Sequence, residues 1–452
     1  MIEQVLAEYA VAERSSALPA DVVHHAKRAV IDWFAALLPG AGEAPATSLV
    51  RALAGDLGHG HSVLYPSGTC APARTAALIN GAAAHVLEFD DIFRDAIYHP
   101  AAPTIAAALA AAQQVDATGD QFLRAVIAGY EISTRIGVAL TTSHYKFWHT
   151  TGTVGTFGAA AAAGCVLGLD ASQMAHAFDT SATFAAGLRK AFSSDAMSKP
   201  LHAGRAAEAG LLAALLAAEG VTGAEDMMAG PNGMGEAMSG GGAPRWEEAA
   251  DGLGKRYNIT SITFKNHGCC GHTFAAIDAT LALKEKVRFD PNAISRITVE
   301  TYKTAHDVVA NGNPSTPFEA KFSVPFVVAT ALLYDSVRLS AFTDARLHDP
   351  ALRDLMRRVE VRVDPVIDAE FPQRWPARVT IQLNDGTCLE HYQTAPKGDP
   401  DNPLTDAELE AKFRDLTGPA IGRAVADQLL DALWSLDSLP SARDIALNAV
   451  LA

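Results

Sequence analysis

Alanine-rich, weakly charged stretches constrain the fold of this chain more than any other feature. Between residues 201 and 218 the sequence is almost continuously Ala, Leu and Gly, so a helix there is expected to be buried on most sides. Of the 452 residues, 49% are hydrophobic and 19% are charged, and much of the apolar part is alanine. This composition favours tightly packed helices over sheets, and the length predicts about two domains.

Charge and the remaining composition exclude several classes of protein. A net charge of -15 argues against nucleic acid as a partner, because phosphate binding needs a cationic face. The apolar runs are interrupted before they reach the roughly 18 residues of a membrane span, so we expect no membrane partner. The N-terminal residues lack the pattern of a signal or transit peptide, which predicts a cytoplasmic protein. The five cysteines form no CxxC pair and are expected to be reduced thiols.

Helical periodicity dominates the first part of the chain. Helices are predicted at 2–38 (two helices), 45–57, 71–86, 102–113, 119–140, 156–167, 172–188 and 201–219. Thr150 and Thr151 are expected to cap the helix at 156–167. The segment 220–254 is rich in Gly, Met and Pro, which predicts a mobile connection at 239–244 and a lid at 230–243.

Beyond Tyr257 the pattern changes to alternating apolar and polar residues. Strands are predicted at 259–264, 294–302, 359–363, 377–383 and 387–392, with helices at 273–286, 323–334 and 350–358. The turn Asn384-Asp385-Gly386 predicts a hairpin between the last two strands. Helices return at 406–416, 421–433 and 442–451 and are expected to pack back on the first part. We therefore predict a large, discontinuous all-helical domain (1–257 and 404–452) and a smaller inserted α+β domain (258–403).

Four segments gather the ionisable side chains: His85 to His99, Tyr145 to His149, Lys199 to Arg205, and Lys265 to His272. Lys199-Pro200 stands before the helix predicted at 201–219, where free backbone N–H groups suit a carboxylate. Small-molecule sites usually lie at domain junctions, so these segments are candidates for one site.

Motifs for metal, nucleotide and hydrolase chemistry are missing from the sequence. His85, His99 and the adjacent acids Asp90 and Asp91 resemble metal ligands, but HExxH, CxxC and EF-hand spacings are absent, and neighbouring acids on a helix point apart. No dinucleotide or Walker glycine pattern follows a strand, and no GxSxG elbow is present. We expect neither a metal nor a cofactor. Acid/base chemistry remains, in which cations hold carboxylates and a desolvated His, Lys or Tyr moves a proton.

Five segments in the same order resemble the MmgE/PrpD family: HVLEFDD with HP, WHTTGTVGTFGAAAA, MSKPLHAGRAA, FKNHGCCGHTFAAIDA and EAKFSVPF. That family includes 2-methylcitrate dehydratase, cis-aconitate decarboxylase and iminodisuccinate epimerase. The resemblance covers nearly the whole chain. It implies a helical domain built from both chain ends, an inserted α+β domain, a homodimer, and an active site at the domain junction without metal or cofactor.

Carried over position by position, the resemblance implies a set of site residues. The expected catalytic residues are Asp91, His99, Tyr145, His149, Lys199 and Lys265. His202, Arg205, Cys270 and His272 are expected to bind substrate. Two positions depart from the decarboxylase-like branch, because Cys270 replaces a histidine and Phe326 replaces a tyrosine. The proline that commonly follows the histidine at 149 is also absent.

Neighbouring residues have structural interpretations. Asp90 is expected to cap a loop or pair with Arg94, and His85 to be a hydrogen-bonded core histidine. Tyr130 and Tyr302 are expected to serve in packing. Arg205 can equally pair with Glu208, and His267 competes with His272 for one role.

The predicted function is proton abstraction α to a carboxylate of a small di- or tricarboxylic acid. The leading version is a 2-methylcitrate dehydratase-like hydro-lyase, with His149 or Tyr145 on one face of the substrate, His99 with Asp91 on the other, and Lys199 and Lys265 on carboxylates. An epimerase or racemase of an iminodisuccinate-like dicarboxylate is the alternative, followed by a cis-aconitate-type decarboxylase. A non-catalytic carboxylate-binding protein is the alternative from a different class.

Overall fold

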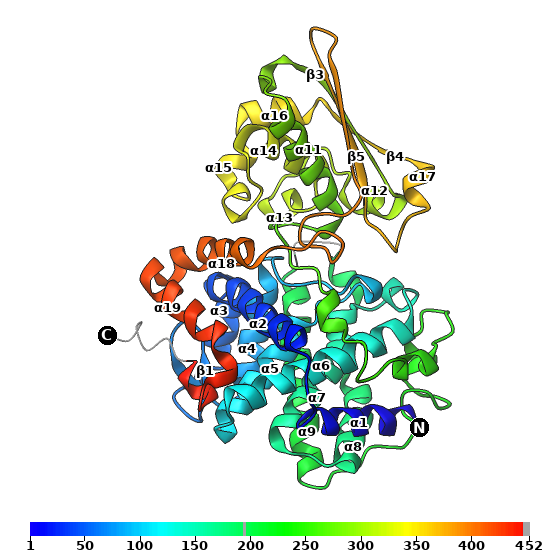
Figure 1. Cartoon of the computed structure of the whole chain (residues 1–452), viewed down its shortest axis with the longest axis vertical. Helices are drawn as coiled ribbons and strands as arrows, with labels where there is room; N and C mark the ends of the chain where they lie inside the picture. The colour runs from blue at the N-terminus through cyan, green and yellow to red at the C-terminus, as the bar shows by residue number, and fades with distance from the viewer. Residues whose placement is uncertain (193–195, 446–452) are drawn as a thin grey trace. The chain divides into compact units, whose positions relative to one another are not determined.

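The computed structural model describes residues 1–192 and 196–445 and divides the chain into two compact units. Unit 1 comprises Met1–Ile262 with Thr405–Ala452, and unit 2 comprises Thr263–Leu404. The sequence predicts these breaks after residue 257 and before residue 404. The fold is mainly α-helical with small sheets, as predicted (Figure 1).

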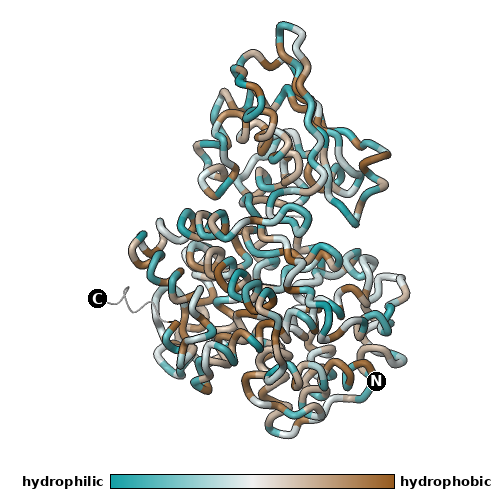
Figure 2. The backbone as a smooth tube through the Cα atoms, viewed as in Figure 1, coloured by the Kyte–Doolittle hydropathy of each residue, from teal (hydrophilic) through white to brown (hydrophobic). Residues whose placement is uncertain are grey.

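Five long helices form the centre of unit 1. Helix α7 packs against α9, α6 and α5, and α4 packs against α9 and α5. Hydrophobic stretches run through these central helices (Figure 2). Their bounds are α4 Ala73–Val86, α5 Ala101–Val115, α6 Gly119–Leu140, α7 Thr150–Leu167 and α9 Ser198–Ala218.

The other elements of unit 1 surround this centre. They include the hairpin of β1 and β2, which the sequence patterns miss because each strand has only three residues. The bounds are α1 Ile2–Glu13, α2 Ala20–Gly40, α3 Ala46–Ala52, β1 Ser62–Leu64, β2 Thr69–Ala71, α8 Ala171–Phe184, α10 Met234–Met238, α18 Asp406–Ile421 and α19 Arg423–Trp434.

Small residues let α9 approach its neighbours at backbone distance. A Cβ atom on Gly204 would overlap the carbonyl oxygen of Leu78 in α4, and one on Gly210 would overlap the carbonyl oxygen of Thr156 in α7. Because only glycine avoids these overlaps, the two positions fix how closely α9 packs on both helices.

Helix α7 is the one described helix that is long and apolar enough to cross a membrane by length and composition. Of that helix, 89% is buried. Burial against α5, α6 and α9 identifies α7 as the core helix of unit 1, which accounts for its apolar character.

The returning helix α18, in orange, closes unit 1 by packing on α2, in blue, so segments from the first and last parts of the chain lie side by side (Figure 1). Lys412 of α18 is fully buried and pairs with the fully buried Asp32 of α2 at 2.5 Å. Lys412 also donates to the carbonyl oxygen of Phe89 at 3.0 Å. The discontinuous helical unit is therefore joined by a buried ion pair as well as by apolar contact.

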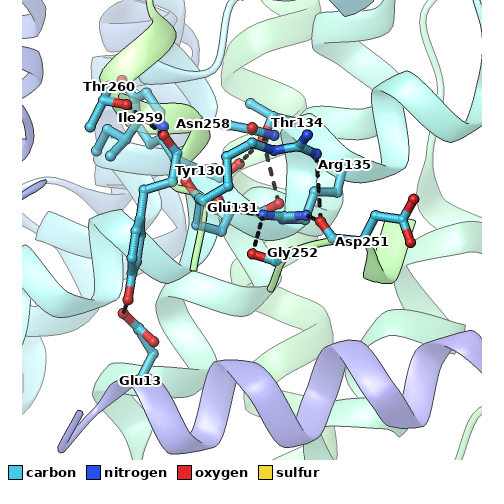
Figure 3. Close-up of polar contacts among 12 residues, drawn as sticks. Glu13, Tyr130, Glu131, Thr134, Arg135, Asp251, Gly252, Asn258, Ile259 and Thr260 are labelled. Atoms are coloured by element: carbon cyan, nitrogen blue, oxygen red, sulfur yellow. Dashed lines mark hydrogen bonds and ion pairs between the residues drawn. The ribbon is translucent and has the colours of Figure 1, made fainter. Parts of the chain in front are cut away.

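A buried network fixes the segment that leads from unit 1 into unit 2 against α6 (Figure 3). Glu131 accepts from the backbone N–H of Ile259 at 3.0 Å and pairs with Arg135 at 3.4 Å, while Arg135 donates to the carbonyl oxygen of Asp251. Thr134 accepts from the Asn258 side chain at 3.0 Å. Burial raises the pKa of Glu131 to about 7.

Unit 2 contains a four-stranded sheet in the order β4-β3-β5-β6. Strand β3 runs parallel to β4 and antiparallel to β5, and β5 and β6 form the predicted hairpin. Gly386 in its turn has φ of +90°, the conformation that favours glycine there. The bounds are β3 Ile294–Thr301, β4 Val359–Val363, β5 Ala377–Leu383 and β6 Cys388–Gln393.

Helices complete unit 2, and α11 and α14 pack together and against the sheet. Their bounds are α11 Phe274–Lys286, α12 Lys303–Val309, α13 Pro317–Ala320, α14 Val324–Tyr334, α15 Asp344–Leu347, α16 Pro350–Met356 and α17 Pro365–Asp368. The predicted helices at 273–286, 323–334 and 350–358 are confirmed within one or two residues at their starts.

Two local predictions are wrong. The strand expected at 259–264 is a short 3-10 helix, Asn258–Ser261, because its backbone and side chains bond to α6 instead of to a neighbouring strand. Thr150 and Thr151 do not cap a later helix, since α7 already begins at Thr150 with His149 at the N-cap. The hydroxyl of Thr153 donates to the preceding turn of the same helix.

The ends of other predicted helices differ from the structure. Helix α8 stops at Phe184 instead of residue 188, and the helix predicted at 442–451 begins as a 3-10 turn, Ala442–Asp444. Residues 446–451 of that prediction lie outside the described part of the chain.

The glycine-rich segment after α9 is held against other parts of unit 1 by hydrogen bonds and close contacts. The carbonyl oxygen of Met238 bonds to His144 at 2.8 Å, and the Arg245 N–H donates to Ala139 at 2.7 Å. A Cβ atom on Gly240 or Gly242 would overlap Ser143. These contacts connect the segment to the turn that follows α6.

Candidate active site

Helix ends in unit 1 bring four histidines together. His85 lies in the last turn of α4, His99 stands two residues before α5, His149 is the N-cap of α7, and His202 lies in the second turn of α9. Because α4, α5, α7 and α9 pack on one another, residues more than one hundred positions apart in sequence meet here. We call these four side chains the histidine cluster.

Ring contacts run through the histidine cluster without interruption. The ring of His85 stacks on that of His149 with centroids 5.4 Å apart and meets that of His99 edge-on at 4.9 Å. His149 Nδ1 lies 3.2 Å from His202 Nδ1. His85 is fully buried and His149 is 1% exposed. The prediction that His85 is a hydrogen-bonded core histidine is confirmed, and its ring also belongs to this cluster.

Burial keeps the rings of His149 and His202 uncharged near neutral pH. The pKa of His149 lies well below its usual range, chiefly because the ring is buried and secondarily because His85 and Lys199 are close. Burial also lowers the pKa of His202 to about 4. Neutral imidazole is the form that can accept a proton, so the cluster is suited to general-base chemistry.

Asp90 and a backbone carbonyl orient two of the rings. Asp90 Oδ2 lies 2.6 Å from His85 Nδ1 and 3.5 Å from His99 Nδ1. His99 Nδ1 also lies 2.7 Å from the carbonyl oxygen of Asp91, which can only accept, so the proton of the neutral ring is on Nδ1. The lone pair of His99 is then on Nε2. His85 Nε2 is buried without a hydrogen-bond partner among the described residues.

The Asp90 carboxylate lies on the two histidines, a role that the interpretation as a loop cap or a partner of Arg94 does not include. Its neighbour Asp91 is fully buried, accepts from the Ala101 N–H at 3.0 Å and contacts the Tyr130 hydroxyl at 2.8 Å. Burial raises the pKa of Asp91 well above its usual value. Asp91 therefore holds the start of α5, and Tyr130, expected to serve in packing, is its hydrogen-bond partner.

Lys199 has an anionic partner that the sequence analysis did not assign. Its ammonium pairs with the carboxylate of Glu88, and both residues are buried, with 8% and 4% exposed. Glu88 has φ of +61°, a left-handed conformation that is uncommon for a residue other than glycine. The signal in the sequence was an acid two residues after the end of α4, in the segment HVLEFDD.

Tyr145 lies beside the histidine cluster through an aromatic neighbour. The Phe192 ring is 4.9 Å from that of His149 and 6.4 Å from that of Tyr145, and Lys199 Nζ stands 5.3 Å from the Phe192 centroid. The guanidinium of Arg189 lies 4.6 Å from the Tyr145 ring centroid.

Arg205, expected to bind substrate, pairs with Glu208 on the same helix, and its side chain is 52% exposed. Glu208 also pairs with Arg74. The structure therefore has the alternative arrangement, in which Arg205 is the partner of Glu208. This pairing balances the positive charge of Arg205 without a substrate.

The remaining predicted residues lie in unit 2. Lys265 is 1% exposed. His272 stacks on Trp375 with centroids 4.6 Å apart, and its Nδ1 lies 2.6 Å from the Tyr302 hydroxyl. Burial raises the pKa of Tyr302, so its hydroxyl keeps its proton and donates to Nδ1, which leaves an N–H on Nε2 of the neutral ring. Tyr302, expected to serve in packing, orients His272.

Cys270 is partly exposed, and Phe326 is fully buried in the core of unit 2. His267 bonds to Asp278 at 2.8 Å, which gives it a structural partner of its own.

Among the described residues, His85, Asp90 and His99 form the one group whose atoms lie close enough together to hold a metal ion, within 4.8 Å of one another. The two atoms nearest each other, His85 Nδ1 and Asp90 Oδ2, already share a hydrogen bond. A metal ion there would have to replace the protons of these hydrogen bonds.

The fold and the site together define a discontinuous helical unit with a buried imidazole cluster and an α+β unit inserted between its two segments. Comparison with family models places the chain in a known family: residues 4–247 match the MmgE/PrpD N-terminal domain and residues 267–437 match the MmgE/PrpD C-terminal domain. The chain belongs to the MmgE/PrpD family, as the resemblance of the motifs predicts.

The chain is similar to curated proteins whose names refer to cis-aconitate decarboxylase. The chain is 29% identical over 456 residues to the cis-aconitate decarboxylase-like protein oryM of Aspergillus oryzae, covering 94% of this chain and 92% of that protein. It is 26% identical over 447 residues to cis-aconitate decarboxylase of Aspergillus terreus, covering 93% and 90%. It is also 26% identical over 385 residues to cis-aconitate decarboxylase of Mus musculus, covering 81% and 76%.

Proposed function

We propose that this protein is an enzyme that acts on a small di- or tricarboxylic acid by moving a proton at the carbon next to a carboxylate. The observation that carries this proposal is the histidine cluster, whose members His149 and His202 have lowered pKa values beside the buried Lys199. The names of the relatives, which refer to an acid with several carboxylates, support the same class of substrate.

In this proposal His149 is the base. Its ring is neutral, desolvated and in contact with His202 and His85, so a proton taken from carbon can be shared along the cluster. His99 is the second acid/base group, with its tautomer set by the carbonyl oxygen of Asp91. Asp91 acts through the backbone of α5 and is a positioning residue.

Charge stabilisation completes the mechanism. Removing the proton places negative charge on the adjacent carboxylate, an enolate-like intermediate that cations stabilise. We propose Lys265 as a carboxylate-binding residue in unit 2, with His272 donating from Nε2, and Lys199 and Tyr145 as hydrogen-bond donors to the substrate in unit 1. Each proposed step uses side chains alone.

The leading reaction is elimination of water from a hydroxy acid, in which a protonated group returns its proton to the departing hydroxide. Decarboxylation is the second candidate, because the curated relatives described above are named for it. Cys270 and Phe326 stand against it, since the decarboxylase-like branch is expected to have a histidine and a tyrosine there. Epimerisation uses the same proton abstraction and returns the proton to carbon.

Proton NMR in D2O tests the reaction directly. The purified protein is mixed with 2-methylcitrate, citrate, cis-aconitate and iminodisuccinate, and spectra follow elimination, carbon loss and deuterium exchange together. A new alkene signal with loss of the hydroxy acid supports the hydro-lyase. Carbon loss from cis-aconitate would instead identify a decarboxylase. Uptake of deuterium from the solvent with inversion at the carbon would identify an epimerase.

Two histidine variants provide the matched comparison. His149→Gln removes the proposed base, and we expect turnover to fall by about a hundredfold or more. His306→Gln, at a position in unit 2 whose side chain is 40% exposed, should leave turnover unchanged. Tight binding of a substrate that neither exchanges nor turns over would favour the non-catalytic binding protein instead.

The resemblance also leads us to propose a homodimer. Sedimentation equilibrium of the purified protein tests this, and a mass of one chain, 47.4 kDa, at all concentrations would contradict it.

A further inference from the structure

The pairing of Lys199 with Glu88 has a consequence for the substrate. A lysine that binds a substrate carboxylate needs a positive charge that no protein carboxylate already balances. Here the buried carboxylate of Glu88 balances the charge of Lys199. A second carboxylate placed on Lys199 would stand near Glu88, and two like charges repel strongly when both are shielded from water.

The backbone at Glu88 supports a specific role for this residue. Its φ of +61° is costly for a side chain with a Cβ atom, and such conformations persist where the surrounding structure demands them. Glycine would adopt this conformation freely, yet the position holds a residue whose carboxylate reaches Lys199 across 111 positions of sequence.

The surroundings of the pair favour a neutral group beside Lys199. The rings of His149 and His202 are uncharged near neutral pH, and the Phe192 ring lies 5.3 Å from Lys199 Nζ. The pair itself has no net charge. An uncharged polar group such as a hydroxyl or carbonyl can accept from the ammonium without approaching Glu88 as an anion.

We propose that Glu88 is a specificity-determining residue: by pairing with Lys199 it makes that position select an uncharged polar group of the substrate and reject a carboxylate. This inference rests on the proposed function, since it assumes that a small polycarboxylic acid binds at the histidine cluster. It revises the expectation that Lys199 holds a substrate carboxylate, and it makes Lys199 a donor to a hydroxyl or carbonyl oxygen.

The test compares ligands that share one skeleton and differ in charge. Tricarballylate has three carboxylates, and in each of its two monoamides one carboxylate becomes an uncharged amide of nearly the same size. Binding is measured by isothermal titration with the full-length protein. We expect the wild-type protein to bind at least one monoamide about tenfold more tightly than tricarballylate.

Glu88→Gln removes the charge and keeps the size of the side chain. Lys199 then has an unbalanced positive charge, so we expect the preference for that monoamide to fall by about tenfold or to reverse. Glu88→Asn is a second variant, because asparagine tolerates positive φ and lacks the charge. Thermal melting confirms that each variant is folded.

Glu219→Gln is the matched control. Glu219 is the exposed C-cap residue of the same helix α9, so the variant makes the same change in net charge away from Lys199. It should keep the wild-type preference. Equal preferences in the wild-type protein and both Glu88 variants would overturn the inference and leave the proposed function standing. Absence of binding of all three ligands to every form would contradict both.

Discussion

Asp90 and Asp91 are adjacent residues with different tasks, and their partners explain the difference. The carboxylate of Asp90 orients the imidazoles of His85 and His99, whereas that of Asp91 accepts from the backbone of Ala101 and contacts Tyr130. Both are fully buried, so each carboxylate needs such partners to remain inside the protein. Of these two adjacent acids, Asp90 therefore belongs to the candidate site, and Asp91 fixes the start of α5.

Replacing Asp91 tests its positioning role. Asp91→Ala leaves the N–H of Ala101 and the hydroxyl of Tyr130 without this acceptor, so we expect the free energy of unfolding to fall by about 3 kcal/mol. Asp91→Asn keeps one acceptor oxygen and should cost about 1 kcal/mol. Urea denaturation followed by circular dichroism measures both. Asp95→Ala, at a side chain that is 61% exposed, is the control and should change stability little. Equal stability of Asp91→Ala and Asp95→Ala would contradict the role.

The lowered pKa of His149 predicts how activity depends on pH. A base must be neutral to accept a proton. Burial lowers the pKa of His149, so its ring stays neutral at pH values below the ordinary histidine pKa of 6.5. The acid side of the kcat/KM profile should therefore fall at a pH below 6.5. Proton NMR of the histidine Cε1–H signals, assigned with His149→Gln, checks this directly. A His149 signal that titrates at or above 6.5 would contradict the proposal that burial tunes this base.

At the scale of elements, glycine decides how closely the helices of the centre pack. The first two turns of α9 carry Lys199 and His202, so the distance between α9 and α4 also sets the distance from Lys199 to Glu88 at the end of α4. Alanine would favour a helix more strongly than glycine does at these positions. Close packing of two backbones is therefore the reason for glycine there.

Gly204→Ala distinguishes packing from helix propensity. Propensity alone predicts a gain of about 1 kcal/mol in the free energy of unfolding. The overlap of the new Cβ with the carbonyl oxygen of Leu78 predicts a loss of about 3 kcal/mol instead. Thermal and urea denaturation measure the sign. Gly55→Ala, where a Cβ atom would meet nothing within 4 Å, is the control. A stabilised Gly204→Ala protein would show that α9 can move away from α4.

On the scale of the whole molecule, segments from the first and last parts of the chain meet in unit 1, and a buried ion pair joins them. Asp32 and Lys412 come from α2 and α18, 380 positions apart. Breaking a buried pair leaves a charge without its partner in a medium that solvates it poorly. The stability of the helical unit therefore depends on a residue that follows the inserted α+β unit in sequence.

Lys412→Ala tests this closure. We expect the free energy of unfolding to fall by about 4 kcal/mol, because Asp32 remains buried without this partner. Lys27→Ala is the matched control, since Lys27 pairs with Asp437 of the C-terminal segment, whose side chain is 45% exposed. That variant should cost about 0.5 kcal/mol. Similar losses in the two variants, measured by urea denaturation, would show that burial of the Lys412 pair does not matter.

The sequence by itself determined the mainly helical fold, the second α+β unit and the family, because helical and strand periodicity and the order of motifs are local properties. It also named His99, His149, Lys199 and Lys265 as candidates. The strand predicted at 259–264 failed because α6 supplies the bonding partners of that segment, and such partners are not visible in a local pattern.

Only the tertiary structure decided which ionisable side chains are partners. His85 enters the cluster, Arg205 pairs with Glu208, and Glu88 pairs with Lys199 across 111 residues because α4 and α9 pack together. Burial then decides the chemistry, since the same imidazole or carboxylate has a different pKa in water and among apolar side chains. The sequence supplies the reactive groups, and the packing of the helices sets their partners and their charge.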